Sequence, residues 1–201
     1  MTKPKIVVLA SGEGSLLQAL IDQQSLLNYQ IDLVISDNPQ AKALERAAEA
    51  EIETRLILEK EFSDRASWQL ALLETLIDHE PKLIVLAGFM RILPESVVKR
   101  FTNQILNSHP SLLPKYRGLA AVAQALAAGD SETGATLHLV DQGVDTGPIV
   151  EQVVVRVLPQ DTNQELHQRI KLAEQALLPK IVHSLVTHGY QVHDGKVVIN
   201  H

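Results

Sequence analysis

The fold is decided by the stretch Ile6-Val7-Val8-Leu9-Ala10-Ser11-Gly12-Glu13-Gly14-Ser15. Its first five residues form a continuous apolar run, which is typical of a strand buried on both faces. The two glycines that follow allow the backbone to turn tightly. Apolar residues then recur at helical spacing after Ser15. The stretch therefore predicts a strand, a turn and a helix, which is the opening unit of an α/β fold.

The same alternation continues through the first half of the chain. Further strands are predicted at 31–35, 54–58, 83–87 and 105–108, and further helices at 41–50, 63–77 and 94–101. Strands that alternate with helices predict a Rossmann-like, mostly parallel sheet flanked by helices. In such sheets ligands bind beyond the carboxyl ends of the strands, where the polar and glycine-rich segments of this sequence fall.

The second half has a different pattern. Two strands are predicted at 135–140 and 149–155, joined by a polar turn. A capping-box sequence, Thr162-Asn163-Gln164-Glu165, precedes a long helix at 165–186 that stops near Gly189. Apolar alternation around Asp194-Gly195 indicates a terminal hairpin. No internal repeat or flexible linker interrupts the 201 residues, so we expect one compact domain.

Composition excludes several classes of protein. Hydrophobic residues make up 45% and charged residues 21%, which is typical of a globular chain. A net charge of −6 and an aromatic content of 3% argue against a nucleic-acid surface. There is no cysteine, and no apolar run is long enough to span a membrane. The segment from Met1 to Lys5 does not resemble a signal peptide, so we expect a cytoplasmic protein.

The loop at Ser11–Ser15 lies where a helix begins, and free N–H groups there favour an anion such as phosphate. A dinucleotide fingerprint needs a third glycine where Leu17 stands, and a P-loop pattern is also missing. Glu13 adds negative charge that slightly disfavours phosphate. The loop by itself fits either a ligand-binding turn or a tight turn without a ligand.

Asn107 and His109 lie two residues apart at the end of a predicted strand, so their side chains share one face. Pro110 favours an extended conformation for the residue before it. An amide beside an imidazole can stabilise an oxyanion and transfer a proton. The alternative is a histidine with a purely structural role at the strand end.

Asp145 lies in a polar turn, Val144-Asp145-Thr146-Gly147-Pro148. Its carboxylate is either an ordinary turn residue or a partner that orients a nearby histidine and raises the pKa of that ring. His138 alternates within an apolar strand and is expected to be a buried structural residue. The remaining histidines show no metal-ligand spacing, so no metal site is predicted; they are His79, His167, His183, His188, His193 and His201.

The order of the motifs resembles that of the folate-dependent formyltransferases, from Ile6 to about Ile199. The motifs are 11–15, 88–93, Asn107-Ser108-His109-Pro110-Ser111-Leu112-Leu113-Pro114, 133–138 and Asp145-Thr146-Gly147-Pro148. Two segments, 10–15 and 88–93, are similar to those of one branch of this family, the phosphoribosylglycinamide formyltransferases. The resemblance implies a single formyltransferase domain, with a nucleotide-binding-like half at 1–106 and a catalytic and C-terminal half at 107–201.

The resemblance also implies roles for individual residues. The implied catalytic residues are Asn107, His109 and Asp145. The implied contacts to the phosphorylated substrate are Gly14, Ser15, Leu16 and Glu174. The implied folate contacts are Arg65, Met90, Arg91, Ile92, Leu93, Asn107, Asp141, Val144 and Asp145.

The implied reaction moves a formyl group from 10-formyltetrahydrofolate to the amine of phosphoribosylglycinamide, a step of purine biosynthesis. The folate is a co-substrate, and no metal is needed. The implied partners are small molecules, with no nucleic acid or membrane, and the implied state is a monomer or homodimer. The sequence departs from this branch at Leu16, where asparagine is usual, and at Ala120, where histidine is frequent.

Other functions remain open on the residues alone. Residues 117–121 are similar to methionyl-tRNA and sugar formyltransferases, so another amine, such as an amino sugar, is an alternative substrate. The acidic charge argues against tRNA. A catalytically silent folate- or nucleotide-binding protein is a further alternative, which retention of Asn107, His109 and Asp145 disfavours. A dinucleotide-binding module is the weakest alternative because of Leu17.

Overall fold

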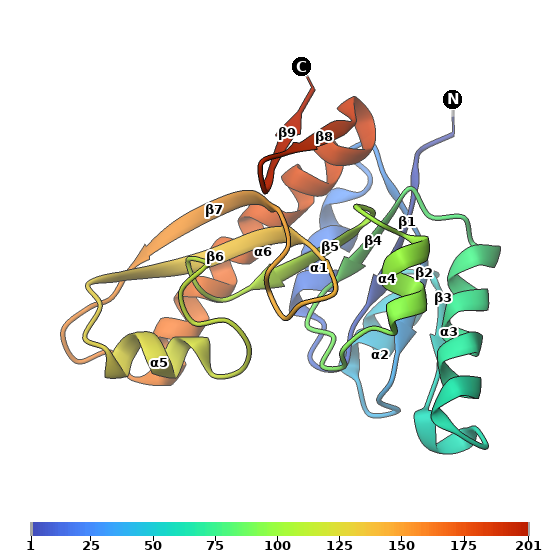
Figure 1. The fold of residues 1–201 in the computed structure, drawn as a ribbon, viewed down its shortest axis with the longest axis horizontal. Coiled ribbons are helices and arrows are strands. Elements are labelled where there is room, and N and C mark those ends of the chain that lie inside the picture. Colours follow the sequence, from blue (N-terminus) through green and yellow to red (C-terminus); the bar gives the residue numbers. More distant parts are fainter. Residues whose placement is uncertain (1, 201) are drawn as a thin grey trace.

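The computed structural model describes residues 2–200, so Met1 and His201 lie outside the described part of the chain. Figure 1 labels the helices and strands. The strands are β1 Lys5–Leu9, β2 Gln30–Ser36, β3 Glu53–Leu56, β4 Leu83–Leu86, β5 Ile105–His109, β6 Glu132–Leu139, β7 Ile149–Arg156, β8 Tyr190–His193 and β9 Lys196–Ile199. The helices are α1 Ser15–Gln23, α2 Lys42–Glu49, α3 Arg65–Asp78, α4 Glu95–Arg100, α5 Ala121–Ala127 and α6 Asn163–His188, with a 3-10 turn at Glu59–Glu61.

All nine strands form one sheet in the order β3-β2-β1-β4-β5-β6-β7-β9-β8. The five strands β3, β2, β1, β4 and β5 run parallel to one another. β6 is antiparallel to both β5 and β7, and β8 and β9 form an antiparallel hairpin. The predicted mostly parallel α/β sheet, with a C-terminal strand pair, a long helix and a terminal hairpin, is confirmed.

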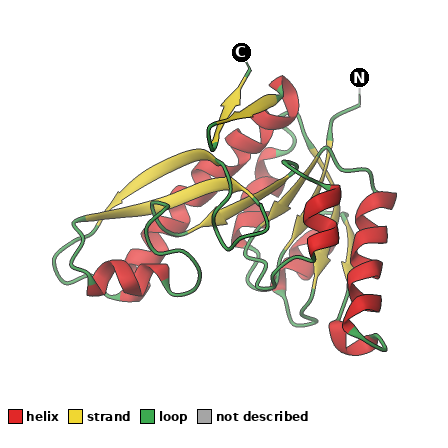
Figure 2. Cartoon of the chain, viewed as in Figure 1, coloured by secondary structure: helices red, strands yellow, loops and turns green. Residues whose placement is uncertain are grey.

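Helices cover both faces of the sheet (Figure 2) because its central strands are apolar on both sides. Ile6 and Val8 of β1 pack with α1, α2 and α6 on one face. Val7 and Leu9 pack with α3 and α4 on the other face. Since successive side chains of a strand point to opposite faces, the continuous run at 6–10 supplies both cores.

β6 and β7 form a long arm beside the parallel part of the sheet, and α5 lies below its outer end (Figure 1). Val122 of α5, Ala135 of β6 and the α6 residues Leu166 and Ile170 form a smaller core there. No element was predicted for α5, which is short and alanine-rich. Packing against β6 and α6 fixes this helix, and the local sequence does not encode that contact.

The observed boundaries of several elements differ from the predicted ones by a few residues. The strand predicted at 54–58 is observed as Glu53–Leu56, because Ile57 and Leu58 leave the sheet and bury themselves before the 3-10 turn. The strand predicted at 135–140 begins earlier, at Glu132, because Glu132 pairs with Arg156 of β7. The capping box at Thr162 is confirmed, and so is the hairpin turn.

The loops that follow β1, β2, β4 and β5 meet at the carboxyl edge of the sheet. Ser11 donates its backbone N–H to the carbonyl of Gly88 at 3.1 Å, which joins the loops after β1 and β4. This edge is where a parallel sheet binds its ligands. Among residues 2–200, none of the helices combines the length and hydrophobicity needed to span a bilayer.

Candidate active site

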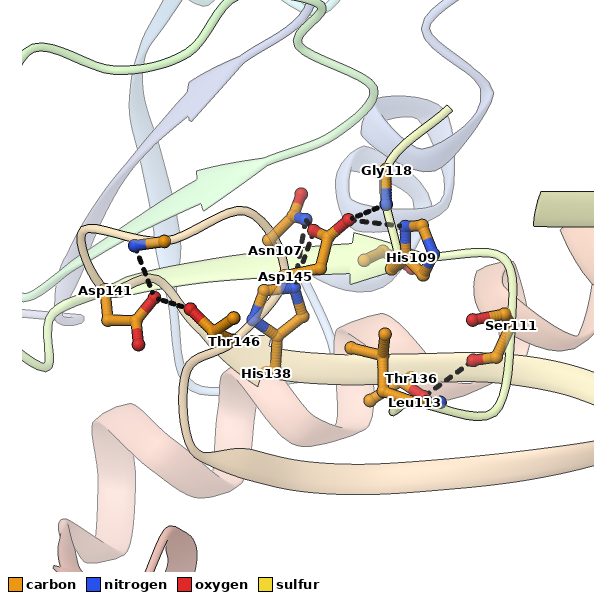
Figure 3. Close-up of polar contacts among 12 residues, drawn as sticks. Asn107, His109, Ser111, Leu113, Gly118, Thr136, His138, Asp141, Asp145 and Thr146 are labelled. Carbon is orange, nitrogen blue, oxygen red and sulfur yellow. Dashed lines mark hydrogen bonds and ion pairs between the residues drawn. The ribbon is translucent and has the colours of Figure 1, made fainter. Parts of the chain in front are cut away.

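The structure brings Asn107, His109 and Asp145 together at the end of β5 (Figure 3). β5 runs through His109, one residue beyond the predicted end. Asn107 and His109 therefore project from the same side of the strand, as predicted. Both contact Asp145: Asn107 Nδ2 donates to Asp145 Oδ1 at 3.3 Å, and His109 Nδ1 lies 3.2 Å from Asp145 Oδ2. A hydrogen bond and a charged contact to Asp145 thus join the three side chains into one group.

The turn that carries Asp145 is held by its own side chains. Asp141 accepts hydrogen bonds from the Gly143 N–H at 3.0 Å and the Thr146 hydroxyl at 2.6 Å. Gly147 packs so closely that an added Cβ would lie 1.8 Å from the Leu139 carbonyl oxygen. Asp145 itself has a φ of 51°, in the left-handed region. The turn is thus fixed in a shape that aims the Asp145 carboxylate at β5.

His138 belongs to the same group. It is buried, as predicted, but its role extends beyond packing: Nε2 lies 3.1 Å from Asn107 Nδ2 and 3.3 Å from Asp145 Oδ1. The Leu139 carbonyl lies 3.0 Å from His138 Nδ1 and accepts a hydrogen bond from it. Nε2 therefore faces both the Asn107 amide and the Asp145 carboxylate. Sequence reasoning missed this contact because it depends on Asn107 pairing with His138 between β5 and β6.

The Asp145 carboxylate is strongly stabilised in its charged form. Burial would by itself raise the pKa of Asp145, but hydrogen bonds from His138 and from the Gly118 N–H oppose it, as do the nearby charges of His109 and His138. The Gly118 N–H donates to Asp145 Oδ2 at 2.8 Å. Together these contacts lower the pKa of Asp145 to about 2. Asp145 is consequently an anion at neutral pH and acts as an acceptor.

His109 has an acceptor on each side of its ring. Nδ1 faces the Asp145 carboxylate, and Nε2 lies 2.8 Å from the backbone carbonyl of Tyr116. Only the doubly protonated imidazolium can donate hydrogen bonds at both nitrogens. The ring is buried, with 5% of its surface exposed. This environment suits a group that delivers a proton or stabilises a developing negative charge.

The loop after His109 is anchored to β6. Thr136, which pairs with His109, donates its hydroxyl to the Ser111 carbonyl at 2.7 Å and accepts from the Leu113 N–H at 3.0 Å. Gln152 of β7 donates to the Leu113 carbonyl at 3.0 Å. These contacts fix the path of the chain that returns Tyr116 and Gly118 to the site.

Glu174 lies on the other side of β5. Ser108 points away from Asn107 and His109 and donates its hydroxyl to the Glu174 carboxylate. Burial raises the pKa of Glu174 to about 7, and the Ser108 hydrogen bond and the charge of Lys171 only partly offset it. The predicted substrate carboxylate is thus a buried, readily protonated group of α6 that does not contact the catalytic trio.

The predicted substrate loop forms the start of α1. Gly14 is the N-cap with a φ of 68°, and a Cβ there would lie 2.7 Å from Ala43 Cα, so both its backbone and its packing require glycine. Ser15 lines a shallow cavity with Arg46 and Gln175. The Leu16 side chain is buried in the core with 8% of its surface exposed. Leu16 can therefore reach a ligand only through its backbone N–H.

The predicted folate contacts lie on several loops and on α3. Met90 and Ile92 are exposed, with 69% and 73% of their surfaces accessible, whereas Leu93 is buried. Val144 is also exposed, at 52%. Arg65 opens α3 one turn before Trp68, whose ring lies 5.7 Å from the guanidinium carbon of Arg91. Within residues 2–200, no cluster of three or more His, Asp or Glu side chains could hold a metal ion.

Comparison with known proteins gives matches over almost the whole chain. The family model "Formyl transferase" matches residues 4–182. A phosphoribosylglycinamide formyltransferase of Mycobacterium tuberculosis is 44% identical over 189 residues, which cover 94% of this chain and 87% of that protein. The trifunctional purine biosynthetic protein adenosine-3 of Chironomus tentans is also 44% identical, over 94% of this chain but only 14% of its own length.

A solved structure shares the fold closely. The crystal structure of glycinamide ribonucleotide transformylase 1 from Symbiobacterium toebii has a TM-score of 0.95 and 36% sequence identity. The match covers 100% of this chain and 95% of that one. On the matched family model, the full-length relatives and the shared fold, the chain belongs to the formyl transferase family.

Proposed function

We propose that the chain transfers the formyl group of 10-formyltetrahydrofolate to the amine of phosphoribosylglycinamide, in purine biosynthesis. The observation that carries the proposal is the meeting of Asn107 and His109 on the Asp145 carboxylate at the carboxyl end of β5. Family membership and relatives of that name support the choice of reaction.

In the proposed reaction the substrate amine attacks the formyl carbon, and a new carbon–nitrogen bond forms. The formyl oxygen becomes an oxyanion in a tetrahedral intermediate. The bond between the formyl carbon and the folate nitrogen then breaks. The amine loses a proton and the departing folate nitrogen gains one, so the transfer is balanced without an added oxidant or reductant.

His109 and Asn107 supply the hydrogen-bond donors in this scheme. The His109 imidazolium donates to the oxyanion and serves as the proton source. The Asn107 amide becomes the second donor by exchanging its contact with His138 for the oxyanion. Asp145 stays ionised and keeps the ring oriented through Nδ1. His109 Nε2 then exchanges its present acceptor, the Tyr116 carbonyl, for the formyl oxygen.

We assign the two substrates to two parts of the carboxyl edge. The folate lies against Met90–Leu93 and the turn with Asp141, Val144 and Asp145, reaching toward Asn107 and Arg65. The exposed apolar side chains of Met90, Ile92 and Val144 suit the flat face of a pterin ring. The phosphate lies at Gly14, Ser15 and the backbone N–H of Leu16, where the start of α1 favours an anion. Glu174 serves the amine substrate from α6.

The remaining assignments follow from the same proposal. The folate is a co-substrate, and the chemistry above uses neither a metal nor a bound prosthetic group. We infer that the chain acts on small molecules in the cytoplasm, without a nucleic-acid or membrane partner, as a single formyltransferase domain that is a monomer or homodimer.

The direct test is an assay of formyl transfer with 10-formyltetrahydrofolate and phosphoribosylglycinamide. Production of tetrahydrofolate and formylated amine in equal amounts is expected. An amino sugar in place of phosphoribosylglycinamide is the matched comparison. Turnover with the amino sugar alone would contradict the proposed substrate, whereas no turnover with either amine would contradict the proposed reaction.

A further inference from the structure

Asp37 lies at the carboxyl edge between the loops that follow three neighbouring strands. It comes directly after β2, and 10% of its side chain is exposed. Its Oδ1 accepts a hydrogen bond from the Ser11 hydroxyl at 2.5 Å, and its Oδ2 accepts from Arg91 Nε at 2.7 Å. Ser11 follows β1 and Arg91 follows β4. One carboxylate therefore ties the loop after β2 to the loops that follow β1 and β4.

Ser11 passes this contact on to the backbone of the segment after β4. Its hydroxyl oxygen accepts from the Met90 N–H at 2.9 Å, while its own hydrogen is given to Asp37. Because a hydroxyl has one hydrogen and two lone pairs, the bond to Asp37 leaves the Ser11 oxygen free to accept from Met90. Asn38 further holds Ser11 by donating Nδ2 to its carbonyl at 2.9 Å.

The Arg91 side chain contacts three other side chains of the protein. Its guanidinium pairs with Asp37 and Glu59 and lies beside the Trp68 ring. The bonds to Asp37 and Glu59 use two of the five guanidinium N–H donors, and together with the Trp68 ring they hold this side chain in place. Its neighbours Met90 and Ile92 point their apolar side chains to the surface. A ligand at this segment therefore meets the exposed side chains of Met90 and Ile92, beside an Arg91 side chain that Asp37 and Glu59 hold in place.

The sheet does not depend on these contacts. Leu9 pairs with Ile35 of β2 and with Leu86 of β4, so the strands are already joined by their ladders. The segment 88–93 lies beyond the end of β4 and contains no helix or strand. Loss of the Asp37 carboxylate should thus loosen this segment while the sheet remains intact.

We propose that Asp37 is a positioning residue that holds segment 88–93 in the shape that receives the folate co-substrate. This inference rests on the proposed function, because segment 88–93 is its proposed folate surface. Asp37 does not touch the reacting atoms, and it acts through Ser11 and Arg91. Its removal is therefore expected to weaken folate binding and to leave the chemical step nearly unchanged.

The test compares Asp37→Ala with the intact chain in steady-state kinetics. The KM for 10-formyltetrahydrofolate should rise by about tenfold or more, the size expected for losing a charge-assisted hydrogen bond. The kcat and the KM for the amine should change little. Asp37→Asn keeps one acceptor oxygen, so its KM for the folate should lie between that of the intact chain and that of Asp37→Ala.

Asp161→Ala is the matched control. Asp161 also pairs with an arginine, Arg169, and 5% of its side chain is exposed, but it lies before α6 and away from segment 88–93. This variant measures the cost of removing a shielded Asp–Arg pair. It should lose thermal stability without a change in the KM for the folate.

A second readout does not need turnover. The Kd of tetrahydrofolate is measured by calorimetry, and the emission of Trp68, the single tryptophan, reports on the surroundings of Arg91. Asp37→Ala should weaken tetrahydrofolate binding and shift the emission, with both changes smaller in Asp37→Asn. An intact chain that binds tetrahydrofolate but transfers no formyl group would contradict the proposed function, and the weaker binding of Asp37→Ala would still support the role of Asp37.

Three results would overturn the inference. The first is a KM for the folate that stays unchanged in Asp37→Ala. The second is a loss of kcat in Asp37→Ala with no change in either KM, which indicates a role in the chemical step. The third is an equal rise in the KM for the folate in Asp37→Ala and Asp161→Ala, which indicates general destabilisation.

Discussion

His109 Nδ1 lies 3.2 Å from Asp145 Oδ2, and both side chains are almost fully shielded from solvent, with 6% and 11% exposed. The pair joins a strand end to a turn that lies far along the chain. A carboxylate that faces an imidazole in a shielded site holds the ring in one orientation.

Asp145→Asn keeps the shape of the side chain but removes its negative charge. The His109 ring then loses its charged partner, and kcat should fall by about a hundredfold or more, the lower range for general acid–base catalysis. Steady-state kinetics measures the effect, and circular dichroism checks that the fold persists. Because the pKa of Asp145 is about 2, the intact chain should show no loss of activity from protonation of this group above pH 5. A kcat close to that of the intact chain would remove Asp145 from the mechanism.

Glu174→Gln should change how stability depends on pH. In the folded chain the pKa of Glu174 is raised from 4.5 to about 7, so its contribution to stability is fully present below pH 4.5 and is lost as pH rises through 7. Glutamine stays neutral and still accepts a hydrogen bond from Ser108. The variant should therefore match the intact chain near pH 4.5 and exceed it above pH 7 by on the order of 3 kcal/mol. Urea unfolding at both pH values measures the difference, and equal stabilities at pH 8 would show that Glu174 is not held neutral.

Gly147→Ala tests the packing of the turn that carries Asp145. Its new Cβ would lie 1.8 Å from the Leu139 carbonyl oxygen, so the turn has to move. The free energy of unfolding should fall by about 2 kcal/mol or more, as for other severe backbone clashes. The matched control is Gly12→Ala, whose Cβ would meet nothing within 4 Å. Equal unfolding midpoints for the two variants would contradict the described packing.

Thr162→Ala tests the start of α6. Thr162 accepts from the Glu165 N–H at 3.2 Å, and Glu165 accepts from the Thr162 N–H at 2.9 Å. Removal of such a cap lowers the free energy of unfolding by about 1 kcal/mol. The melting temperature should fall by ~2–4 °C, with kcat unchanged. Glu165→Ala should lower the melting temperature less in the Thr162→Ala variant than in the intact chain, because the two residues form one capping unit.

The parts of the fold that could be predicted are those encoded locally. The apolar run at 6–10 predicts a strand because every residue in it is buried. The capping box at Thr162 and the turn at Asp194-Gly195 predict their elements because a few adjacent residues fix the backbone there. The helix at 121–127 escaped prediction because its burial depends on β6 and α6.

The candidate site likewise has features that local sequence predicts and features that depend on distant contacts. Asn107 and His109 could be placed on one face because a strand alternates its side chains. The approach of Asp145 depends on the packing of Gly147 against Leu139, and the contact of His138 depends on the register between β5 and β6. Neither is encoded near the residue concerned. The charged pair of Asp37 and Arg91 likewise exists only because β1, β2 and β4 end at the same edge.

The most direct measurement of the central claim is formyl transfer from 10-formyltetrahydrofolate to phosphoribosylglycinamide by the intact chain and by His109→Ala. We expect turnover by the intact chain and a loss of about a hundredfold or more in kcat for His109→Ala, with the fold retained by circular dichroism. Substantial turnover retained by a folded His109→Ala chain would contradict the proposed role of the site.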